Sequence, residues 1–432
     1  MSAEIKFQVK CIELSYQGYG VVLYNQKRIF VPDLFPNEQA IIKIEKLHSN
    51  YGYGVVETLI KRSIHRNKNQ ISTNSASLIN LQYHAQLKWK DQYLRNLLVK
   101  NLNINSQVIQ DIVPSNLPFN YRNKVRYALK AHNQKVFYAE YINKSNTLVQ
   151  VSDFSLNLKS LNYILMYVLE KINFVFQSKI NKLKLIDEIM FRVNENNQAQ
   201  ILFSLHSDYD LPIKLINLLK ENSFIIDLCV KKKNKIFTIF NKQDFTMNLL
   251  DKKFTLKSVN FFQVNLSVFE KILNTIKAKI VNQQDADILI DAYCGVGVFS
   301  QILSSHYQQL IGIEINPSSI ERAKQNALLN KVNNAHYYAG KVESVIEQKP
   351  ISANNSTLII DPPRLGLDIK VIEWISKQNL SNVIYLSCDP RTLTRDLKEF
   401  IKNQYKIEQI IPFDMFPNTH HIETLVFLTK SE

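Results

Sequence analysis

Short apolar runs alternate with helix-like segments from Phe261 to the end of the chain, and this alternation constrains the fold more than any other feature. Each run has an apolar core, as expected of a parallel strand that is buried on both faces of its sheet. We therefore predict an α/β fold with a doubly wound, Rossmann-like sheet, whose ligands bind at the carboxyl ends of the strands. The strand candidates are Asp287–Asp291, Leu310–Glu314, His336–Tyr338, Thr357–Asp361, Asn382–Ser387 and Thr424–Leu428.

The first sixty residues alternate apolar and polar positions instead, with breaks at glycine, proline and asparagine. Five short strands in this space predict a small β-barrel of OB type. Barrels of this type commonly bind single-stranded RNA, and a purely structural barrel is the alternative. The runs are Phe7–Ile12, Gly20–Tyr24, Arg28–Pro32, Ala40–Ile44 and Gly54–Leu59.

The middle of the chain joins these two parts. A polar connector leads into a helix expected from Tyr83 to Leu102. The residues after it predict a central α/β domain of antiparallel strands, with helices at about 157–177 and 211–222 on one face. Its strand candidates are Val125–Leu129, Val136–Tyr138, Glu188–Val193, Ala199–Ser204 and Ile236–Phe240. The expected domains are 1–62, an OB-like barrel; 63–118, a basic connector with a helix; 119–258, a central α/β domain that binds RNA; and 259–432, the doubly wound domain.

Positive charge is concentrated in one region of a chain whose formal net charge is +15. Residues 61–135 hold 13 Lys and Arg against two acidic residues, whereas residues 1–60 hold six of each. Basic and aromatic residues alternate in Tyr121–Tyr127, a mixture suited to phosphate contacts and base stacking. A general lysine-rich bias would not produce this focus, so the charge favours a nucleic-acid partner over a membrane.

Other sequence features exclude several classes of protein. No apolar run is long enough to span a membrane, and the N-terminus lacks the layout of a secretory signal. The four cysteines, Cys11, Cys229, Cys294 and Cys388, are far apart and form no CxxC pair. A disulfide framework or a zinc site is therefore not expected, and a reducing cytoplasm fits best.

A glycine-rich turn follows the first strand of the doubly wound sheet and opens a helix. Gly295 and Gly297 allow a tight turn and a close approach of the backbone to a ligand. The next strand ends at Glu314, 19 residues after Gly295, where a carboxylate can accept hydrogen bonds from a ribose diol. Ser300 stands where a dinucleotide fingerprint has its third glycine, so S-adenosylmethionine is favoured over NAD. A helix-capping or solvated acid is the alternative interpretation of Glu314.

Asp361 lies at the end of the fourth strand, in the run Asp361-Pro-Pro-Arg364. The two prolines hold an extended turn that projects the carboxylate toward the cleft, and a purely structural turn is the alternative. Methyltransferases that act on exocyclic amines carry an aromatic residue where this chain has Arg364. The arginine therefore disfavours amine chemistry.

A thiol and a carboxyl group complete the candidate site. Cys388 follows a strand, and Glu423 lies 35 residues later, before the last strand. A thiolate can add to C6 of a pyrimidine and activate C5 toward a methyl donor, and a carboxylate can then remove the C5 proton. We expect the helix that begins near Thr392, together with Arg391 and Arg395, to lower the pKa of the thiol.

Other residues compete for these roles. Cys294 lies within the glycine turn, where packing is the better interpretation, and Cys11 and Cys229 fall in strand patterns typical of small core residues. His420 and His421 stand just before the last strand and offer bases or metal ligands. Without a matching acid spacing, we interpret them as polar packing or RNA contacts, and no metal site is expected.

Together these motifs resemble those of the RNA uracil-C5 methyltransferases. The matching runs are Phe261–Asn265, Asp291–Gly297, Asp361–Leu367, Ser387–Asp396 and Asp414–Glu423. The resemblance implies that Cys388 is the nucleophile and Glu423 the base. It also implies that four residues contact S-adenosylmethionine: Gln263, Tyr293, Glu314 and Asp361.

Residues 1–60, with the run Gly18–Val21, resemble the TRAM barrel that some members of this family carry. TRAM-bearing bacterial members chiefly modify large-subunit ribosomal RNA, so a uridine of 23S rRNA is the expected substrate and the T-loop of tRNA the alternative. A catalytically silent RNA-binding assembly factor that keeps the fold is a further alternative. Cytosine C5 methylation is disfavoured, because the Pro-Cys pair typical of the cytosine enzymes is absent from the sequence. We expect a monomer that binds ribosomal RNA.

The chain departs from the family pattern in several places. Many ribosomal members hold an iron–sulfur cluster with cysteines that include a Cys-Gly-Gly-Cys run before Leu-Gln-His, whereas this chain has no cysteine in Ala76–Tyr83. An iron–sulfur cluster is therefore expected to be absent. Val298, Lys341 and Asp389 replace residues common in the family, which concerns substrate or cofactor preference rather than the reaction.

Overall fold

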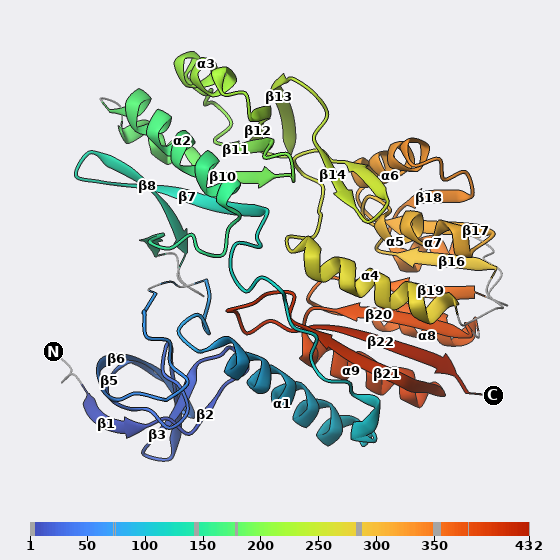
Figure 1. Ribbon diagram of the computed structural model, residues 1–432, viewed down its shortest axis with the longest axis horizontal. Helices are drawn as coiled ribbons and strands as arrows, with labels where there is room; N and C mark the ends of the chain where they lie inside the picture. The colour runs from blue at the N-terminus through green and yellow to red at the C-terminus, as the bar shows by residue number, and fades with distance from the viewer. Residues whose placement is uncertain are drawn as a thin grey trace.

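In the computed structural model, the described residues are 5–71, 73, 75–141, 147–177, 180–281, 287–348, 356–378 and 380–431. These residues form three large sheets and a two-stranded ribbon. Figure 1 shows a small N-terminal sheet, a central layer with helices on one side, and a C-terminal sheet set among several helices. No helix in the described ranges is long and apolar enough to cross a membrane.

The N-terminal sheet is a curved half-barrel with the strand order β1-β5-β6-β4-β3-β2. Val22, Ile29 and Ile42 are fully buried in its small core. All five predicted runs form strands, and the sequence pattern misses only β2, which consists of two residues. The strands are β1 (Lys6–Lys10), β2 (Glu13–Leu14), β3 (Gly20–Tyr24), β4 (Lys27–Val31), β5 (Gln39–Leu47) and β6 (Tyr51–Lys61).

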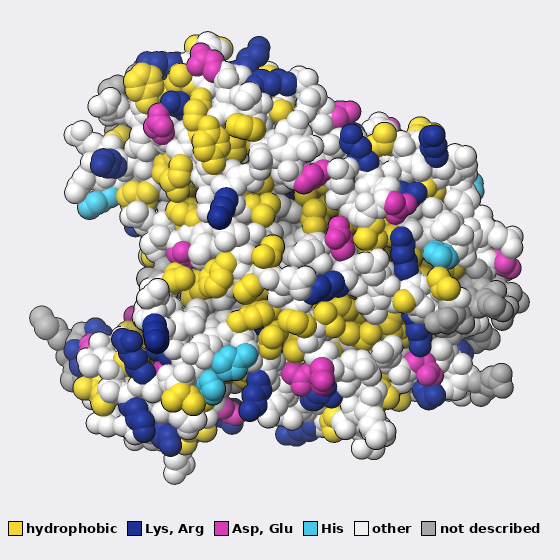
Figure 2. Space-filling model, in the orientation of Figure 1, with side chains coloured by type: hydrophobic (Ala, Val, Ile, Leu, Met, Phe, Trp, Pro, Cys, Tyr) yellow, Lys and Arg dark blue, Asp and Glu magenta, His cyan; other side chains and the backbone are white. Residues whose placement is uncertain are grey.

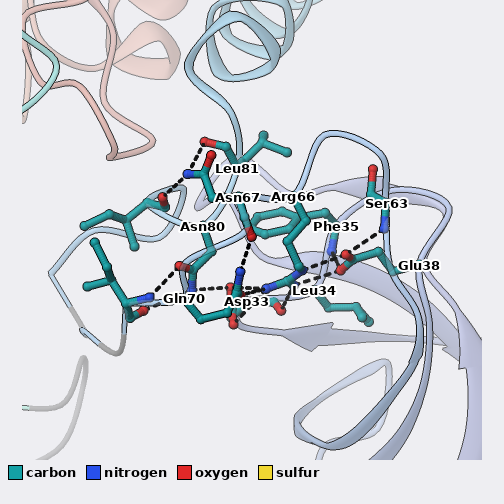
Figure 3. A network of polar contacts seen from close by, with 12 residues as sticks. Asp33, Leu34, Phe35, Glu38, Ser63, Arg66, Asn67, Gln70, Asn80 and Leu81 are labelled. Atoms are coloured by element: carbon teal, nitrogen blue, oxygen red, sulfur yellow. Dashed lines mark hydrogen bonds and ion pairs between the residues drawn. The ribbon is translucent and has the colours of Figure 1, made fainter.

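A buried arginine fastens the connector to the half-barrel (Figure 3). The Arg66 side chain is 2% exposed, and its Nε and Nη2 donate to the two carboxylate oxygens of Glu38 at 2.7 and 2.8 Å. Its Nη1 donates to Asp33 at 3.2 Å, and the guanidinium lies 4.5 Å from the centre of the Phe35 ring. Glu38 also accepts the backbone N–H groups of Phe35 and Ser63. The buried charges are thus paired and hydrogen-bonded, which compensates for their removal from water.

Helix α1 (Tyr83–Leu102) has the predicted bounds. Its buried residues Leu94, Leu98 and Leu102 join one core of the C-terminal sheet. The helix also lies against α9 (Pro390–Lys402), near the end of the chain. The connector helix is therefore packed as part of the C-terminal layer.

The central sheet has the strand order β13-β12-β11-β10-β7-β8-β9, and α2 and α3 cover one face as predicted (Figure 1). One part of the prediction is wrong, because β12 runs parallel to β11 and the sheet is mixed rather than antiparallel. The sequence pattern misses β12, where Asp227 interrupts the apolar residues. The elements are η1 (Ser106–Val108), β7 (Lys124–His132), β8 (Lys135–Tyr141), β9 (Leu148–Gln150), α2 (Lys159–Phe176), η2 (Ile180–Leu185), β10 (Ile186–Val193), β11 (Ala199–Leu205), α3 (Ile213–Glu221), β12 (Ile225–Lys232), β13 (Lys235–Asn241), and the ribbon strands β14 (Thr246–Leu249) and β15 (Lys252–Thr255).

The C-terminal sheet is doubly wound, as predicted, with the strand order β18-β17-β16-β19-β20-β22-β21. Residues of α4, α5 and α6 form the core on one face, and residues of α1, α7, α8 and α9 form the core on the other. All six strand candidates form strands. The elements are α4 (Leu266–Val281), β16 (Ile288–Ala292), α5 (Val298–Ile302), η3 (Ser304–His306), β17 (Gln309–Glu314), α6 (Pro317–Leu329), β18 (Ala335–Ala339), α7 (Val342–Gln348), β19 (Ser356–Ile360), α8 (Ile369–Lys377), β20 (Asn382–Ser387), β21 (Tyr405–Phe413) and β22 (Glu423–Lys430).

Two features of this sheet differ from the prediction. Strand β22 is antiparallel to both of its neighbours, β20 and β21, rather than parallel. The sequence pattern misses the edge strand β21, because Lys406, Glu408 and Gln409 interrupt its apolar residues. The antiparallel direction of β22 brings its first residue to the edge of the sheet at which the parallel strands end.

Candidate active site

The candidate nucleophile and base lie at neighbouring strand ends. Strand β20 ends at Ser387, which pairs with Thr424 near the start of β22. Cys388 follows Ser387, and Glu423 precedes Thr424. The antiparallel pairing therefore brings the thiol and the carboxyl group to one place, although 35 residues separate them in the chain.

Glu423 and Asp361 are electrostatic neighbours at this edge. Asp361 follows β19, the strand beside β20. Glu423 is 3% exposed, and its burial together with the charge of Asp361 raises its pKa well above the usual range. Burial, reinforced by Asp291, raises the pKa of Asp361 to about 7. The positive charge of Arg364 opposes the shift at Glu423, because it favours the ionised carboxylate.

The surroundings of Cys388 do not lower the pKa of its thiol, and the prediction is wrong on this point. Burial, followed by the charges of Glu423 and Asp361, raises the pKa to about 12. The cation that acts in the opposite direction is Arg364, rather than an arginine of α9. The free thiol is therefore protonated at neutral pH, because the charge of Arg364, which favours the thiolate, does not outweigh burial and the two carboxyl groups.

The two arginines expected to activate the thiol have carboxylate partners of their own. Arg391 and Asp389 form an ion pair at 2.7 Å, and Arg395 and Asp396 form another at 2.7 Å. Asp389 is also the N-cap of α9 and accepts the backbone N–H of Arg391 at 2.9 Å. The helix N-terminus and both cations are thus compensated locally, which explains why the prediction fails.

The glycine turn between β16 and α5 is closed by a carboxylate from the next strand. Glu314 Oε2 accepts the backbone N–H of Gly295 at 3.2 Å, and Oε1 accepts that of Asn316 at 2.9 Å. Gly295 and Gly297 have φ angles of 55° and 82°, a region that favours glycine. Tyr293 has a φ angle of 67° in the same turn. The turn therefore places Tyr293 and Glu314, two of the predicted cofactor residues, in one local structure.

Asp291 lies in β16 beneath this turn and is 1% exposed. Its Oδ2 accepts the backbone N–H of Ser300 at 2.9 Å, whereas Oδ1 is buried without a hydrogen-bond partner among the described residues. Burial raises the pKa of Asp291 to about 7. Asp291 was not predicted as a site residue, although it stands at the start of the glycine-rich run Asp291–Gly297. It connects the turn electrostatically to Asp361.

Gln263 lies in a different part of the structure, next to the central sheet. It is 9% exposed and lies just before α4, and its backbone carbonyl accepts a hydrogen bond from Asn123 Nδ2 at 3.0 Å. Asn123 stands just before β7 of the central sheet. The carboxyl edge of the C-terminal sheet carries the other five predicted residues, and in the described part of the chain no hydrogen bond or ion pair joins Gln263 to them. These five are Tyr293, Glu314, Asp361, Cys388 and Glu423.

The segment Asp414–Ile422, which leads into Glu423, is held by residues that the sequence analysis does not single out. Lys90 and Asp414 form an ion pair with 2.5 Å between Nζ and Oδ1, and both side chains are 0% exposed. Lys90 also donates to the carbonyl of Phe416 at 3.1 Å. Burial lowers the pKa of Lys90, and the charge of Asp414 opposes this effect. The pair anchors the first turn of the segment to α1.

Gln86 of α1 holds the same segment further along. Its Nε2 donates to Oδ1 of Asn418 at 2.8 Å, and the backbone N–H of Asn418 donates to its Oε1 at 2.9 Å. Tyr121 Oη and Asn265 Nδ2 donate to carbonyl groups of the segment at 3.1 and 2.9 Å. Gln86 and Lys90 continue the stripe of buried leucines on α1 at a spacing of four residues. This spacing could have predicted from the sequence that both side chains are buried.

A pocket of about 470 Å³ opens beside Cys388. Its walls come from six separate segments of the chain, which include Arg364 and Leu365 and the residues that follow β20. Tyr16 belongs to the loop after β2, and Ser77 belongs to the connector. Tyr93 lies on α1, and Arg391 lies in the first turn of α9. The half-barrel therefore takes part in the surface that surrounds the candidate nucleophile.

His420 and His421 line the same pocket. Burial lowers their pKa values to about 4 and about 2, so both imidazoles are neutral near pH 7. Their ring centroids are 4.1 Å apart, and Nδ1 of His420 lies 3.4 Å from Ser77 Oγ. Nε2 of His421 lies 3.2 Å from Arg364 Nη2. In the ranges that the structure covers, no group of three or more His, Cys, Asp or Glu could hold a metal ion.

The two positions that the family resemblance matches to cluster cysteines are apolar in this chain. Ala76 and Ile79 are each 3% exposed and pack with Tyr121 and Leu156 in a small separate core. These side chains offer no sulfur to iron, so they do not fit an iron–sulfur cluster. The predicted packing of the other thiols is confirmed, because three cysteines are buried: Cys11, Cys229 and Cys294.

Tyr121, one of the two aromatic residues of the basic stretch 121–127, is too buried for base stacking, so the prediction is wrong for this residue. Tyr121 is 5% exposed. The ring of Tyr127 packs against the buried ring of Tyr138, with 5.4 Å between centroids. Both tyrosines serve the packing of the protein, although their place in a basic stretch suggested an RNA-binding surface.

The half-barrel presents an aromatic cluster of its own. The Tyr53 ring lies 5.8 Å from those of Phe30 and Tyr51, and the Tyr51 ring stacks on His48 at 4.6 Å. Tyr51 is 38% exposed. Figure 2 shows several Lys and Arg side chains over the N-terminal sheet, at the lower left. Exposed rings among basic residues suit the bases and phosphates of single-stranded RNA.

Comparisons with known proteins agree on the fold and the class of reaction. The model of the tRNA (uracil-5-)-methyltransferase family matches residues 82–431. The chain is 29% identical over 450 residues to an uncharacterised RNA methyltransferase of Fusobacterium nucleatum, covering 98% of this chain and 95% of that protein. It is 28% identical over 439 residues to one of Oceanobacillus iheyensis, covering 96% and 95%. The crystal structure of Pyrococcus abyssi tRNA (uracil-54, C5)-methyltransferase with S-adenosyl-L-homocysteine shares the fold, with a TM-score of 0.76, 21% identity, and coverage of 98% of this chain and 100% of that one.

Proposed function

Because this chain belongs to the tRNA (uracil-5-)-methyltransferase family, we propose that it methylates C5 of a uridine in 23S ribosomal RNA, with Cys388 as nucleophile and Glu423 as base. Membership itself makes the protein an S-adenosylmethionine-dependent RNA methyltransferase that acts on uracil C5. The proposal adds two points to this membership: the substrate is 23S rRNA, and Cys388 and Glu423 carry out the reaction. The observation that carries the residue assignment is the pairing of Ser387 with Thr424, which sets a thiol and a carboxyl group at one strand end.

The proposed reaction uses the thiol and the carboxyl group in turn. Cys388 transfers its proton to water, and its sulfur bonds to C6 of the uracil, so that the electrons of the C5–C6 double bond make C5 nucleophilic. When bound, S-adenosylmethionine would supply the methyl group: C5 would take it from the sulfonium, and S-adenosylhomocysteine would be left. Glu423 then accepts the C5 proton, the C5–C6 double bond forms again, and the Cys388 thiolate leaves C6. Arg364 supports both residues, because its charge favours the ionised thiol and the ionised carboxylate.

The glycine turn and its neighbours fit the methyl donor. Glu314 closes the turn with one hydrogen bond to Gly295 and retains acceptor capacity for a ribose diol. We assign Tyr293, Asp361 and Gln263 to the same binding site on the strength of the family motifs. Tyr293 and Asp361 also lie at this end of the sheet.

Several features support a ribosomal substrate. The basic excess of the chain, the half-barrel with its exposed rings, and the pocket that the half-barrel shares with Cys388 all suit a large RNA. We infer that the half-barrel is a TRAM module and that the enzyme acts as a cytoplasmic monomer. The T-loop of tRNA is the second candidate, because the printed description of the matching family names tRNA.

Methylation assays on defined RNAs test the substrate. The purified protein and labelled S-adenosylmethionine are incubated with 23S rRNA fragments or with tRNA, both from a strain that lacks the gene. The proposal expects 5-methyluridine in an rRNA fragment and none in tRNA. Product in tRNA alone would replace the proposal with the second candidate, and no product in either RNA would favour a silent assembly factor.

Cysteine variants test the residue assignment. Cys388→Ala is expected to abolish methylation and to leave S-adenosylmethionine binding nearly unchanged, because Cys388 lies outside the glycine turn. Cys229→Ala is the matched control, since this buried cysteine lies in the central sheet and the variant should stay active. Full activity of Cys388→Ala would contradict the covalent mechanism.

A further inference from the structure

We propose that Tyr16 and Arg391 form a stacking platform for the base of a nucleotide next to the target uridine. The inference rests on the proposed function, because it names a second RNA contact of the same site. The platform joins the half-barrel to the catalytic layer, since Tyr16 comes from the loop after β2 and Arg391 from the first turn of α9.

The geometry of the pair is that of a fixed stack. The guanidinium carbon of Arg391 lies 3.9 Å from the centre of the Tyr16 ring. Asp389 holds the guanidinium from the side, with Nε to Oδ1 at 3.1 Å and Nη2 to Oδ2 at 2.7 Å. A planar cation that is held on a ring and by a carboxylate has lost most of its freedom before any ligand binds. Such preorganisation reduces the entropy cost of binding.

The stack remains open to a ligand. The Arg391 side chain is 48% exposed, and both Arg391 and Tyr16 line the pocket beside Cys388. Single-stranded RNA is recognised by stacking its bases on aromatic rings and guanidinium planes. A base on the exposed side of this stack would find the contact that such recognition needs.

The pocket has room for more than the target base. Its volume is about 470 Å³, within the range of roughly 300–1,000 Å³ that takes a whole drug-sized molecule. Tyr93 on α1 and Ser77 in the connector add hydroxyl groups to its walls. A single pyrimidine ring at Cys388 would leave the part of the pocket near Tyr16 unfilled.

The position of the stack limits its ligand to a base close to the target uridine. Asp389 directly follows Cys388, so the guanidinium is held by the residue next to the nucleophile. A nucleotide bound there lies within reach of the target along the same strand, because adjacent nucleotides share one phosphate. The ligand is therefore a neighbouring base of the substrate strand, rather than a distant part of the RNA.

The test compares protein variants with modified RNAs. The RNA fragment that the enzyme methylates is prepared in an intact form and in two forms that lack the base 5′ or 3′ of the target. One of the two abasic RNAs is expected to lower kcat/KM of the parent roughly 5- to 150-fold, because stacking contributes about 1–3 kcal/mol per base. Tyr16→Ala on the intact RNA is expected to lower kcat/KM by a similar factor, mainly through KM.

The decisive measurement is whether the effects of Tyr16→Ala and of the abasic RNA on kcat/KM are independent of each other. Tyr16→Ala and the sensitive abasic RNA together should cost no more than either alone, because both remove the same stack. Tyr16→Phe keeps the ring and should retain most of the activity, whereas Arg391→Lys loses the plane and should behave like Tyr16→Ala. Tyr163→Ala is the matched control, since Tyr163 is an exposed tyrosine on α2.

The platform would be refuted if the two losses multiply or if neither abasic RNA is a poorer substrate. Binding of S-adenosylmethionine by each variant shows that it is folded, and Tyr16→Phe keeps the test decisive if Tyr16→Ala does not fold. Failure of the platform leaves 5-methyluridine formation by the parent intact. Failure of the proposed function removes that product from the parent itself, so the two results are distinguishable.

Discussion

Replacing Lys90 with methionine tests whether its ion pair with Asp414 holds the segment that leads into Glu423. Both side chains are 0% exposed, so Lys90→Met leaves a carboxylate buried without its cation. Breaking a buried ion pair in this way costs about 3–5 kcal/mol. We expect that loss in the free energy of unfolding of the C-terminal layer, measured by urea denaturation with the fluorescence of Trp89 on α1 and Trp374 on α8. We also expect kcat to fall at least about tenfold. A misplaced Glu423 needs to raise the activation free energy by only about 1.4 kcal/mol for that effect.

Two further variants separate this ion pair from general effects of charge. Lys402→Met removes an exposed partner of Glu399 and should cost less than about 0.5 kcal/mol. The double variant Lys90→Met/Asp414→Leu should recover most of the lost stability, because apolar replacement of a whole buried pair is often neutral or stabilising. A Lys90→Met protein within about 1 kcal/mol of the parent, or a double variant less stable than the single one, would refute the reasoning.

Three other predictions concern the thiol, the cation beside it and the connector. Burial and two carboxyl groups raise the pKa of Cys388 to about 12. This thiol should therefore react with iodoacetamide at pH 7.5 at least about tenfold more slowly than a free thiol of pKa about 8.5. Mass spectrometry of the alkylated peptide measures the rate, and equal rates would contradict the prediction. Arg364→Gln removes the cation that favours the ionised Cys388 and Glu423, so both pKa values rise and the acidic limb of the pH–rate profile should move to higher pH; an unchanged limb would show that Arg364 does not act on them. Arg66→Met leaves Glu38 buried without its partner and should make the half-barrel sensitive to proteolysis, whereas the exposed Arg62→Met should not; equal resistance of the two variants would count against the anchoring role of Arg66.

The order of the elements was predictable from the sequence because it depends on local patterns. The bounds of α1 and the turn at Gly295 and Gly297 follow from hydrophobic period and glycine placement, which neighbouring residues determine. The direction of β22 was not predictable, since a buried strand has the same apolar sequence pattern whether its neighbours run parallel or antiparallel to it. Yet that direction is what brings Glu423 to Cys388.

The identity of the candidate site residues was predictable, but their environment was not. The expectation for the thiol assumed that Arg391 was free, whereas the side chain is bound to Asp389 and lies on Tyr16, a residue far away in the sequence. Gln86 and Lys90 were missed because polar residues on a helix are usually solvated, and their burial depends on a segment more than three hundred residues later.

The most direct test of the covalent mechanism uses RNA in which 5-fluorouridine replaces uridine. After methyl transfer C5 carries fluorine instead of a proton, so Glu423 has no proton to remove and Cys388 stays bonded to C6. The account predicts a covalent protein–RNA adduct that forms only with S-adenosylmethionine, and whose RNA-linked peptide contains Cys388. An adduct on another cysteine, or methylated RNA with no adduct at all, would contradict it.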